Sequence, residues 1–437
     1  MTRTNRREFL CKSAAIGAMA SFSVPALART RRPSEKLNIA VIGVAGRGAA
    51  QLAEAKRENV VALCDVDSKN LGAAAEKLPG IKTFSDFRQM FDQTHAQIDA
   101  VTVSTADHTH AAAGIMAMRL GKHCYCEKPL AHSVYEVRRM TEIAREKRLA
   151  TQMGTQIHAG ANYRRAVEWV QSGVLGAISE VHVWLGANFK GPARPVAAEQ
   201  PDAPTDRPPV PANLNWDLWL GPAPYRPYHS AYVPFQWRYW WAFGNGVLGD
   251  FFCHYCDLAF WALGLRAPTT VEAEGPVHPE STARWTIARQ QYPARGGQPP
   301  VTLLWYHGGA YPACVKEKGV PLWPSGVLFV GSQGMLLADY GRHELLPKEK
   351  FAGVKAPAPS IPESVGHHLE WITACKTGSP TTCNFDYSGP LAEAALLCNV
   401  ALRTGKKLTW DATAMKAVGC PEADQYLRRT YREGWTL

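Results

Sequence analysis

The sequence predicts an α/β protein with an N-terminal parallel sheet and a C-terminal α/β domain whose sheet is largely antiparallel and open-faced. Three observations favour this fold class. Strand-like and helix-like segments alternate from residue 37 to 154, which is typical of parallel strands covered by helices on both faces. Strand candidates then follow one another without intervening helices. Finally, 437 residues suffice for two domains with separate cores.

The first part is defined by short apolar runs rich in valine and isoleucine, which predict strands. Strands are expected at residues 37–42, 60–64, 100–104, 123–126 and 150–153, with helices at 49–57, 111–120 and 134–147. The pattern changes after residue 154, so the predicted domains cover residues 35–154 and 155–437.

The second part begins with an amphipathic helix and a strand, at 162–172 and 178–185. A proline-rich stretch at 191–214 predicts a surface loop, and residues 216–261 are dense in aromatic side chains. Further strands are expected at 270–273, 283–288, 301–306, 327–331 and 335–339, and late helices at 361–377 and 390–404.

The N-terminus has the features of an export signal. Arginines 6 and 7 precede Phe9-Leu10, an apolar stretch from Ala14 to Val24 and a small-residue cleavage site at 26–28. This order resembles a twin-arginine signal, with a frayed helix as the alternative. Residues 1–28 are therefore expected to direct the folded protein to the periplasm or beyond, leaving no membrane segment after their removal.

Charge and cysteine content exclude two kinds of function. The net charge of +10 is mixed along the chain and concentrated in no stretch, so a nucleic-acid partner is not indicated. Of the eleven cysteines, Cys253 and Cys256 have the spacing of half a metal site. No second such pair follows, so the pattern favours packing cysteines and no metal.

A glycine-rich loop follows the first predicted strand and opens a helix. Gly43 and Gly48 take the first and third positions of a G-x-G-x-x-G motif, Ala45 replaces the second glycine, and Gly46-Arg47 lie between. At such a loop the pyrophosphate of a dinucleotide lies on the helix N-terminus, where free N–H groups and the helix dipole favour anions. The motif alone is weak.

Asp65 strengthens the motif. It ends the second predicted strand, about 20 residues after Gly43, where an acidic residue binds the adenosine ribose hydroxyls. A carboxylate there repels a 2′-phosphate, so NAD is favoured, with NADP still possible. The alternative is a turn residue at a strand end.

Two separate segments supply candidate acid–base groups. Lys128, in Glu127-Lys128-Pro129, follows a strand of the parallel sheet and is expected at its ligand-binding edge. Asp250 and His254 share a helix face if that segment is helical, an arrangement in which an acid orients a histidine base. The alternatives are a surface lysine and a capped helix with a buried histidine.

These motifs, together with Ser104-Thr105-Ala106-Asp107-His108-Thr109-His110 after the fourth strand, resemble the Gfo/Idh/MocA family of glucose–fructose oxidoreductases and inositol dehydrogenases. The resemblance implies a Rossmann domain joined to a C-terminal domain that carries the substrate and often a subunit interface, and hence a homo-oligomer. It implies that Lys128 and His254 handle the reacting hydroxyl, with Asp250 beside them.

The resemblance also assigns residues around the cofactor and the substrate. Those on the nicotinamide side are Thr105, His108, Glu127, Gln156 (where the family often has asparagine), Trp237 and Arg238. Tyr232, with other tyrosines and tryptophans of 225–241, is a candidate for stacking on a sugar ring, although core packing explains any one of them equally well. Arg164 is a further substrate candidate, with a solvated arginine as its alternative.

The function expected is NAD(P)-dependent oxidation of a carbohydrate or polyol, with a tightly held cofactor because an exported enzyme has no evident pool of free NAD. One alternative is glycoside cleavage through transient oxidation and elimination. Relatives of that kind lack the lysine at the position of Lys128, which favours the oxidoreductase. The other alternative is a non-catalytic carbohydrate-binding protein, which the presence of Lys128 and His254 disfavours.

Overall fold

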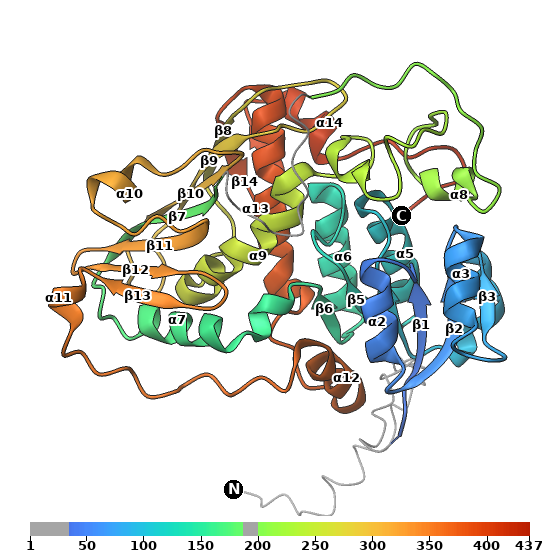
Figure 1. Ribbon diagram of the computed structural model, residues 1–437, viewed down its shortest axis with the longest axis horizontal. Helices are drawn as coiled ribbons and strands as arrows, with labels where there is room; N and C mark the ends of the chain where they lie inside the picture. Colours follow the sequence, from blue (N-terminus) through green and yellow to red (C-terminus); the bar gives the residue numbers. More distant parts are fainter. Residues whose placement is uncertain (1–34, 187–199) are drawn as a thin grey trace, which may run out of the picture.

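The computed structural model describes residues 35–186 and 200–437 (Figure 1). The predicted signal peptide, residues 1–28, and part of the proline-rich stretch at 191–214 lie outside the described residues. Within the described ranges, no helix combines the length and the apolar character needed to cross a bilayer.

The N-terminal sheet has six parallel strands in the order β3-β2-β1-β4-β5-β6. They are β1 (Asn38–Ile42), β2 (Asn59–Cys64), β3 (Lys82–Phe84), β4 (Ala100–Val103), β5 (His123–Cys126) and β6 (Thr151–Met153). The side chains of β1, β4, β5 and β6 are almost completely buried, as the apolar runs predict, whereas the edge strand β3 and the start of β2 are more exposed. The order reverses between β1 and β4, where open parallel sheets bind ligands.

Five helices accompany these strands: α2 (Arg47–Ala55), α3 (Ser68–Ala75), α4 (Phe87–Thr94), α5 (Asp107–Arg119) and α6 (Val134–Glu146). Three have side-chain N-caps. Asp67 and Asp86 accept backbone N–H groups at the starts of α3 and α4, and Ser133 forms a capping box with Glu136 at the start of α6. The sequence analysis missed α3, α4 and β3, which are short, although Phe87, Met90 and Phe91 give α4 a buried apolar face.

The second sheet has nine strands in the order β13-β12-β11-β7-β10-β9-β8-β14-β15. They are β7 (Ile178–Leu185), β8 (Thr270–Glu274), β9 (Thr286–Tyr292), β10 (Val301–His307), β11 (Ser325–Gly331), β12 (Met335–Ala338), β13 (His343–Leu346), β14 (Leu408–Asp411) and β15 (Lys416–Val418). Every pairing is antiparallel except β7 with β10. The largely antiparallel sheet is thus confirmed. The β9 strand extends beyond its predicted end at 288, because its register with β10 pairs Tyr292 with Val301.

Long helices cover one face of the second sheet and join it to the first domain. They are α7 (Ala161–Gln171), α9 (Gly246–Leu263) and α13 (Phe385–Thr404). In Figure 1, α13 runs between the second sheet and α6, and it packs against both α6 and α9. The other face carries a smaller cluster around Trp184 and Trp323, beside α10 (Ala313–Glu317). The remaining short helices are α8 (Trp216–Leu220), α11 (Lys348–Phe351), α12 (His367–Thr377) and α14 (Asp424–Leu427).

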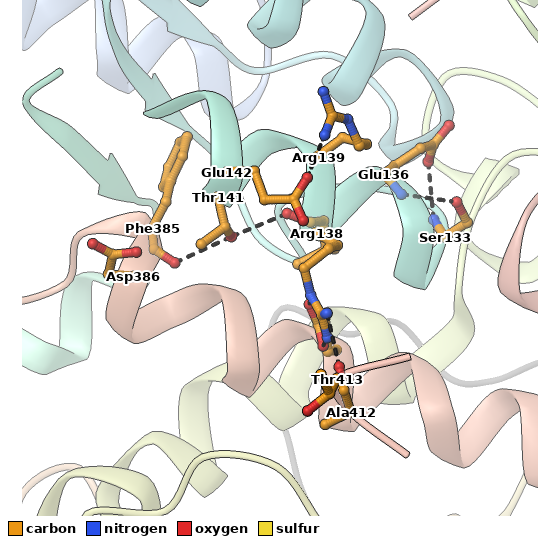
Figure 2. A network of polar contacts seen from close by, with 12 residues as sticks. Ser133, Glu136, Arg138, Arg139, Thr141, Glu142, Phe385, Asp386, Ala412 and Thr413 are labelled. Carbon is orange, nitrogen blue, oxygen red and sulfur yellow. Dashed lines mark hydrogen bonds and ion pairs between the residues drawn. The ribbon is translucent and has the colours of Figure 1, made fainter. Parts of the chain in front are cut away.

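Polar contacts fix α13 to α6, as Figure 2 shows. The Arg138 guanidinium donates to both carboxylate oxygens of Glu393 at 2.7 Å and to the carbonyl of Ala412 at 2.8 Å. The Thr141 hydroxyl donates to the carbonyl of Phe385 at 3.3 Å. The two domains therefore share a polar and well-packed interface.

The chain after residue 154 also returns to the first domain. Trp371 and Cys375 of α12 belong to the same buried cluster as residues of β1, and the ring of Trp371 lies 5.6 Å from that of Tyr125 in β5. The Lys376 ammonium pairs with Glu58 at 2.6 Å. The predicted domain 155–437 therefore contains the second sheet and also α12, a helix that completes the core of the first domain.

Candidate active site

A cavity of about 1320 Å³ lies at the carboxyl ends of β1, β2, β4 and β5, facing α9 of the second domain. Most of the predicted site residues line it: Gly43, Ala45, Gly46, Arg47, Asp65, Thr105, His108, Glu127, Lys128, Gln156, Trp237, Arg238, Asp250 and His254. Residues more than 100 positions apart thus meet where the topology of an open parallel sheet predicts a ligand site.

The glycine loop is shaped by close backbone packing. A Cβ at Gly43, whose φ is +81°, would lie 2.6 Å from the carbonyl oxygen of Ser104, and one at Gly48 would lie 2.0 Å from that of Gly43. By contrast, nothing lies within 4 Å of a Cβ placed on Gly46, the residue that begins α2 without a side-chain cap. The uncapped helix start faces open space, which fits a pyrophosphate.

Asp65 holds this loop in place. One carboxylate oxygen accepts the N–H of Val44 at 2.9 Å, and the other accepts the N–H of Asp67 at 2.9 Å. Burial raises the pKa of Asp65, while these two N–H groups act in the opposite direction. The carboxylate lines the cavity and retains free lone pairs, so it can also accept ribose hydroxyls.

Glu127 connects the glycine loop to β5. Its carboxylate accepts hydrogen bonds from Arg47 Nε at 3.1 Å, from the Gln51 amide, and from the Gln156 amide at 3.2 Å. Gly154 is needed beside it, because a Cβ there would lie 2.4 Å from the carboxylate. Glu127 therefore acts as an anchor between three elements as well as lining the cavity.

Lys128 and Asp250 form an ion pair across the domain interface. Arg238 Nε lies 3.6 Å from the other carboxylate oxygen of Asp250. Burial alone would raise the pKa of Asp250, but the charges of Lys128 and Arg238 outweigh it and lower the pKa below its usual value. Asp250 is therefore an ionised carboxylate that positions the Lys128 ammonium at the cavity wall.

His254 lies one helical turn after Asp250 on α9, as the spacing predicts. The expectation that Asp250 orients this histidine is corrected, because both of its oxygens face cations. Within the described residues the buried Nδ1 of His254 has no hydrogen-bond partner. Burial, and secondarily the charge of Lys128, lowers the pKa of His254 to about 3. The imidazole is thus neutral, and the residue lines the cavity.

Asp257, one turn further along α9, has a structural role. It accepts the Tyr387 hydroxyl at 2.7 Å and faces Nδ1 of His158 at 3.0 Å, all within the core. It therefore does not join Asp250 and His254 in the cavity.

Two of the predicted substrate-contact residues lie away from the cavity. The Arg164 guanidinium donates to the carbonyl of Pro362 at 2.7 Å and lies over the ring of Trp261. Tyr232 is only 3% exposed, in an aromatic cluster with Trp216 and Phe243. Neither residue lines the cavity, so core packing accounts for both. The aromatic residues of segment 216–261 that do line it are Trp219, Tyr228, Phe235, Trp237, Phe251 and Tyr255.

His108 is buried beneath the cavity. Its ring nitrogens lie 2.9 Å from the carbonyl of Trp219 and 3.3 Å from that of Phe243. Burial lowers its pKa to about 3, so the ring is neutral. His108 thereby ties the loop after β4 to the aromatic segment.

Asp107 is a site residue that the sequence analysis did not single out, although it stands inside the quoted stretch after β4. It is buried in the cavity wall, with the Asn245 amide at 3.4 Å. Burial raises the pKa of Asp107 to about 7, although the charges of Arg238 and Lys128 favour its ionised form. Its partners come from other segments, so no local signal marks it.

Asp107 should make stability depend on pH. Its carboxyl ionises near pH 4 in the unfolded chain. Between about pH 4 and 7 the folded protein therefore keeps a proton that the unfolded chain has released, and stability falls as the pH rises, by at most about 1.4 kcal/mol per unit. We expect the melting temperature of the NAD-free protein to fall less between pH 5 and 7 in Asp107→Asn. An unchanged slope would contradict this assignment.

The described residues include no grouping of three or more His, Cys, Asp or Glu side chains that could hold a metal ion. Cys253 and Cys256 are buried on α9, and all ten cysteines in the described ranges are free. The packing role expected of this pair agrees with their burial.

Comparison with known proteins identifies the family of this chain. Residues 37–155 match the profile described as "Oxidoreductase family, NAD-binding Rossmann fold", and residues 161–298 match the family's "C-terminal alpha/beta domain". Together these matches span more than half of the chain. The protein belongs to the Gfo/Idh/MocA oxidoreductase family. The N-terminal domain is thus an NAD-binding Rossmann domain, and the residues around its cavity fit that cofactor.

Individual relatives of this family member are distant. Myo-inositol 2-dehydrogenase of Thermotoga maritima is 28% identical over 35% of this chain and 46% of its own length. Levoglucosan dehydrogenase of Pseudarthrobacter phenanthrenivorans is 26% identical over 44% of this chain and 39% of its own. The matched part thus spans less than half the length of these curated relatives.

Solved structures extend the likeness to both domains. The WlbA dehydrogenase from Bordetella pertussis, in complex with NADH and UDP-GlcNAcA, superposes with a TM-score of 0.58 at 18% identity. The superposition covers 86% of this chain and 99% of that one. At this identity the likeness shows a common two-domain fold.

Proposed function

We propose that this family member is an NAD-dependent oxidoreductase acting on a hydroxyl group of a carbohydrate or polyol. The observation that carries the proposal is the convergence of Lys128, Asp250 and His254 in the same cavity as the glycine loop and Asp65. Relatives named for inositol and levoglucosan support this substrate class.

Each polar group has a distinct task in this proposal. Bound NAD supplies the hydride acceptor. The Lys128 ammonium, positioned by Asp250, donates a hydrogen bond to the substrate oxygen and stabilises the negative charge that develops there. The neutral imidazole of His254, which lines the cavity beside Lys128, accepts the hydroxyl proton.

The proposal that the cofactor is tightly held is supported by residues 211–219 of the second domain, which we call the strap. Backbone hydrogen bonds join the strap to the chain between β2 and α3. The Ser68 N–H donates to the carbonyl of Asn213 at 2.8 Å, and the Asn215 N–H donates to the carbonyl of Val66 at 2.9 Å. Leu214, Leu218 and Trp219 of the strap line the cavity together with Asp65. Release of the adenosine half would then require these contacts to open.

We further propose that the protein is exported through its twin-arginine signal to the periplasm, and that copies assemble through the C-terminal sheet. An exported enzyme with a retained cofactor must return that cofactor to its starting redox state in each turnover. Light scattering measures the oligomeric state, and fractionation of cells that express the full chain tests whether the protein reaches the periplasm.

The redox cycle gives the sharpest test. Protein purified without added NAD should release nucleotide only on denaturation, as identified by mass spectrometry. Incubated with a panel of sugars and polyols, it should complete many turnovers, yielding one oxidised and one reduced product. Reduced nicotinamide should not exceed one equivalent per site. Steady reduction of added NAD, with no turnover in its absence, would leave a plain dehydrogenase. A hydrolysed glycoside with no net oxidation would identify the alternative glycosidase, and no reaction at all would refute both.

A further inference from the structure

A second cavity, of about 340 Å³, lies where the start of α6, the C-terminal half of α13 and residues 425–430 meet. Its volume is in the range of small-molecule sites. Ser133, the N-cap of α6, is part of its wall, and the capping box of Ser133 with Glu136 is visible in Figure 2. The family function proposed above makes no use of this space.

The wall of this second cavity is strongly basic. Arg226, Arg403 and Arg429 line it, while no aspartate or glutamate is among the described residues that do so. His132 also lines it, but burial lowers its pKa well below the usual value, so its ring adds no charge. Two of the arginines reach carboxylates outside the wall: Arg226 pairs with Glu280 at 2.5 Å, and Arg429 pairs with Glu136 at 2.7 Å. The cavity therefore carries a surplus of positive charge.

Arg403 is the source of that surplus. Its guanidinium lies between two rings, 4.8 Å from the centroid of Trp241 and 4.0 Å from that of Tyr426. In the described part of the chain its guanidinium makes no hydrogen bond or close ion pair, and burial lowers its pKa although the charge of Glu280 acts in the opposite direction. A guanidinium held by two rings is fixed in orientation, and its N–H fork remains available to a ligand.

Two further polar atoms in this wall lack partners. Nη1 of Arg429 and Nε2 of His132 are both buried, and neither finds a hydrogen-bond partner among the described residues. An unpaired buried donor is costly, so such groups are usually satisfied by an ion, a water or a ligand. Both belong to residues that line the cavity beside Arg403.

We propose that this cavity is a binding site for the phosphate or carboxylate group of a small organic anion. Arginine matches both groups because its planar fork gives two parallel hydrogen bonds to a pair of oxygens. The aromatic and aliphatic walls, including Trp241 and Val400, accommodate the rest of the molecule.

The site lies directly behind the active-site wall. Arg429 also donates to the carbonyl of His108, and the Asn399 amide donates to the carbonyl of Asn245 at 3.0 Å. Both His108 and Asn245 contact groups that face the first cavity. An anion bound here is therefore placed to influence that wall, although the proposal concerns binding alone.

Calorimetric titration of inorganic phosphate and of succinate into NAD-saturated protein at constant ionic strength tests the site. NAD saturation is needed because the glycine loop also favours phosphate. We expect at least one of the two anions to bind at one equivalent. Arg403→Gln should weaken that binding at least 10-fold. Arg428→Gln is the matched control, since Arg428 also lies over a tyrosine ring, Tyr135, but outside the cavity, and it should change affinity less than twofold.

Gln425→Glu provides a second variant that leaves the core intact, because Gln425 is exposed at the cavity rim. The added negative charge should weaken anion binding several-fold. The anion that binds identifies the preferred group. Absence of saturable binding by both anions, or equal binding in wild type, Arg403→Gln and Gln425→Glu, would overturn the proposal. Because the readout is binding, its result is independent of whether the enzyme oxidises a sugar.

Discussion

Replacing Lys128 with methionine should lower turnover at least about 100-fold, the scale expected for loss of an acid–base group. The ammonium is held by Asp250 at the cavity wall, and methionine retains the length of the side chain without the charge. NAD affinity should change little, because the glycine loop and Asp65 are untouched. Steady-state kinetics on the best substrate from the panel, with NAD affinity by calorimetry, measure both effects.

Lys376→Met is the matched control for this experiment. Lys376 is also a largely buried lysine paired with a carboxylate, Glu58, but it lies on α12 away from the cavity. Its loss should lower thermal stability and leave turnover within about twofold. Near-normal turnover of Lys128→Met, or an equal loss in Lys376→Met, would remove Lys128 from the catalytic assignment.

His254→Ala should produce a loss of similar size, and His254→Gln distinguishes a base from a residue that only fills space. Since burial lowers the pKa of His254 to about 3, the imidazole stays neutral throughout the working range. The wild-type rate should therefore show no decline from protonation of this residue between pH 5 and 7. A large loss in His254→Ala that His254→Gln fully restores would indicate that the residue only fills space.

Asp65→Ala should weaken NAD binding about 10- to 100-fold, the scale of hydrogen bonds to a charged group. The variant loses the ribose acceptor and also the two backbone bonds, to Val44 and Asp67, that hold the glycine loop. NADP binding should weaken much less, because the charge that repels a 2′-phosphate is removed as well. Equilibrium titration with both nucleotides measures the ratio.

Asp65→Asn separates the two contributions of this residue. The amide keeps an acceptor for one backbone N–H but has no charge, so NAD affinity should recover in part while discrimination against NADP should not. Tighter binding of NADP than NAD by the wild type would show that the role assigned to Asp65 is wrong.

Much of the first domain could be predicted from local pattern. Strands β1, β2, β4, β5 and β6 lie within about two residues of their expected ends, because strands buried on both faces need continuous apolar runs. The cavity follows from the same pattern, since the carboxyl ends of parallel strands meet at one edge. The resemblance to the family further predicted that Asp250 and His254 lie at the same site.

The sequence by itself thus determined the fold class, the nucleotide loop with Asp65, and the residues that meet at the cavity. Only the tertiary structure decided their partners: Asp250 pairs with Lys128 rather than orienting His254, and Arg164 donates to the carbonyl of Pro362 away from the cavity. It also revealed Asp107 and the strap at 211–219. Periodicity records which face of an element is buried, whereas the choice of a hydrogen-bond partner far along the chain depends on how the elements pack.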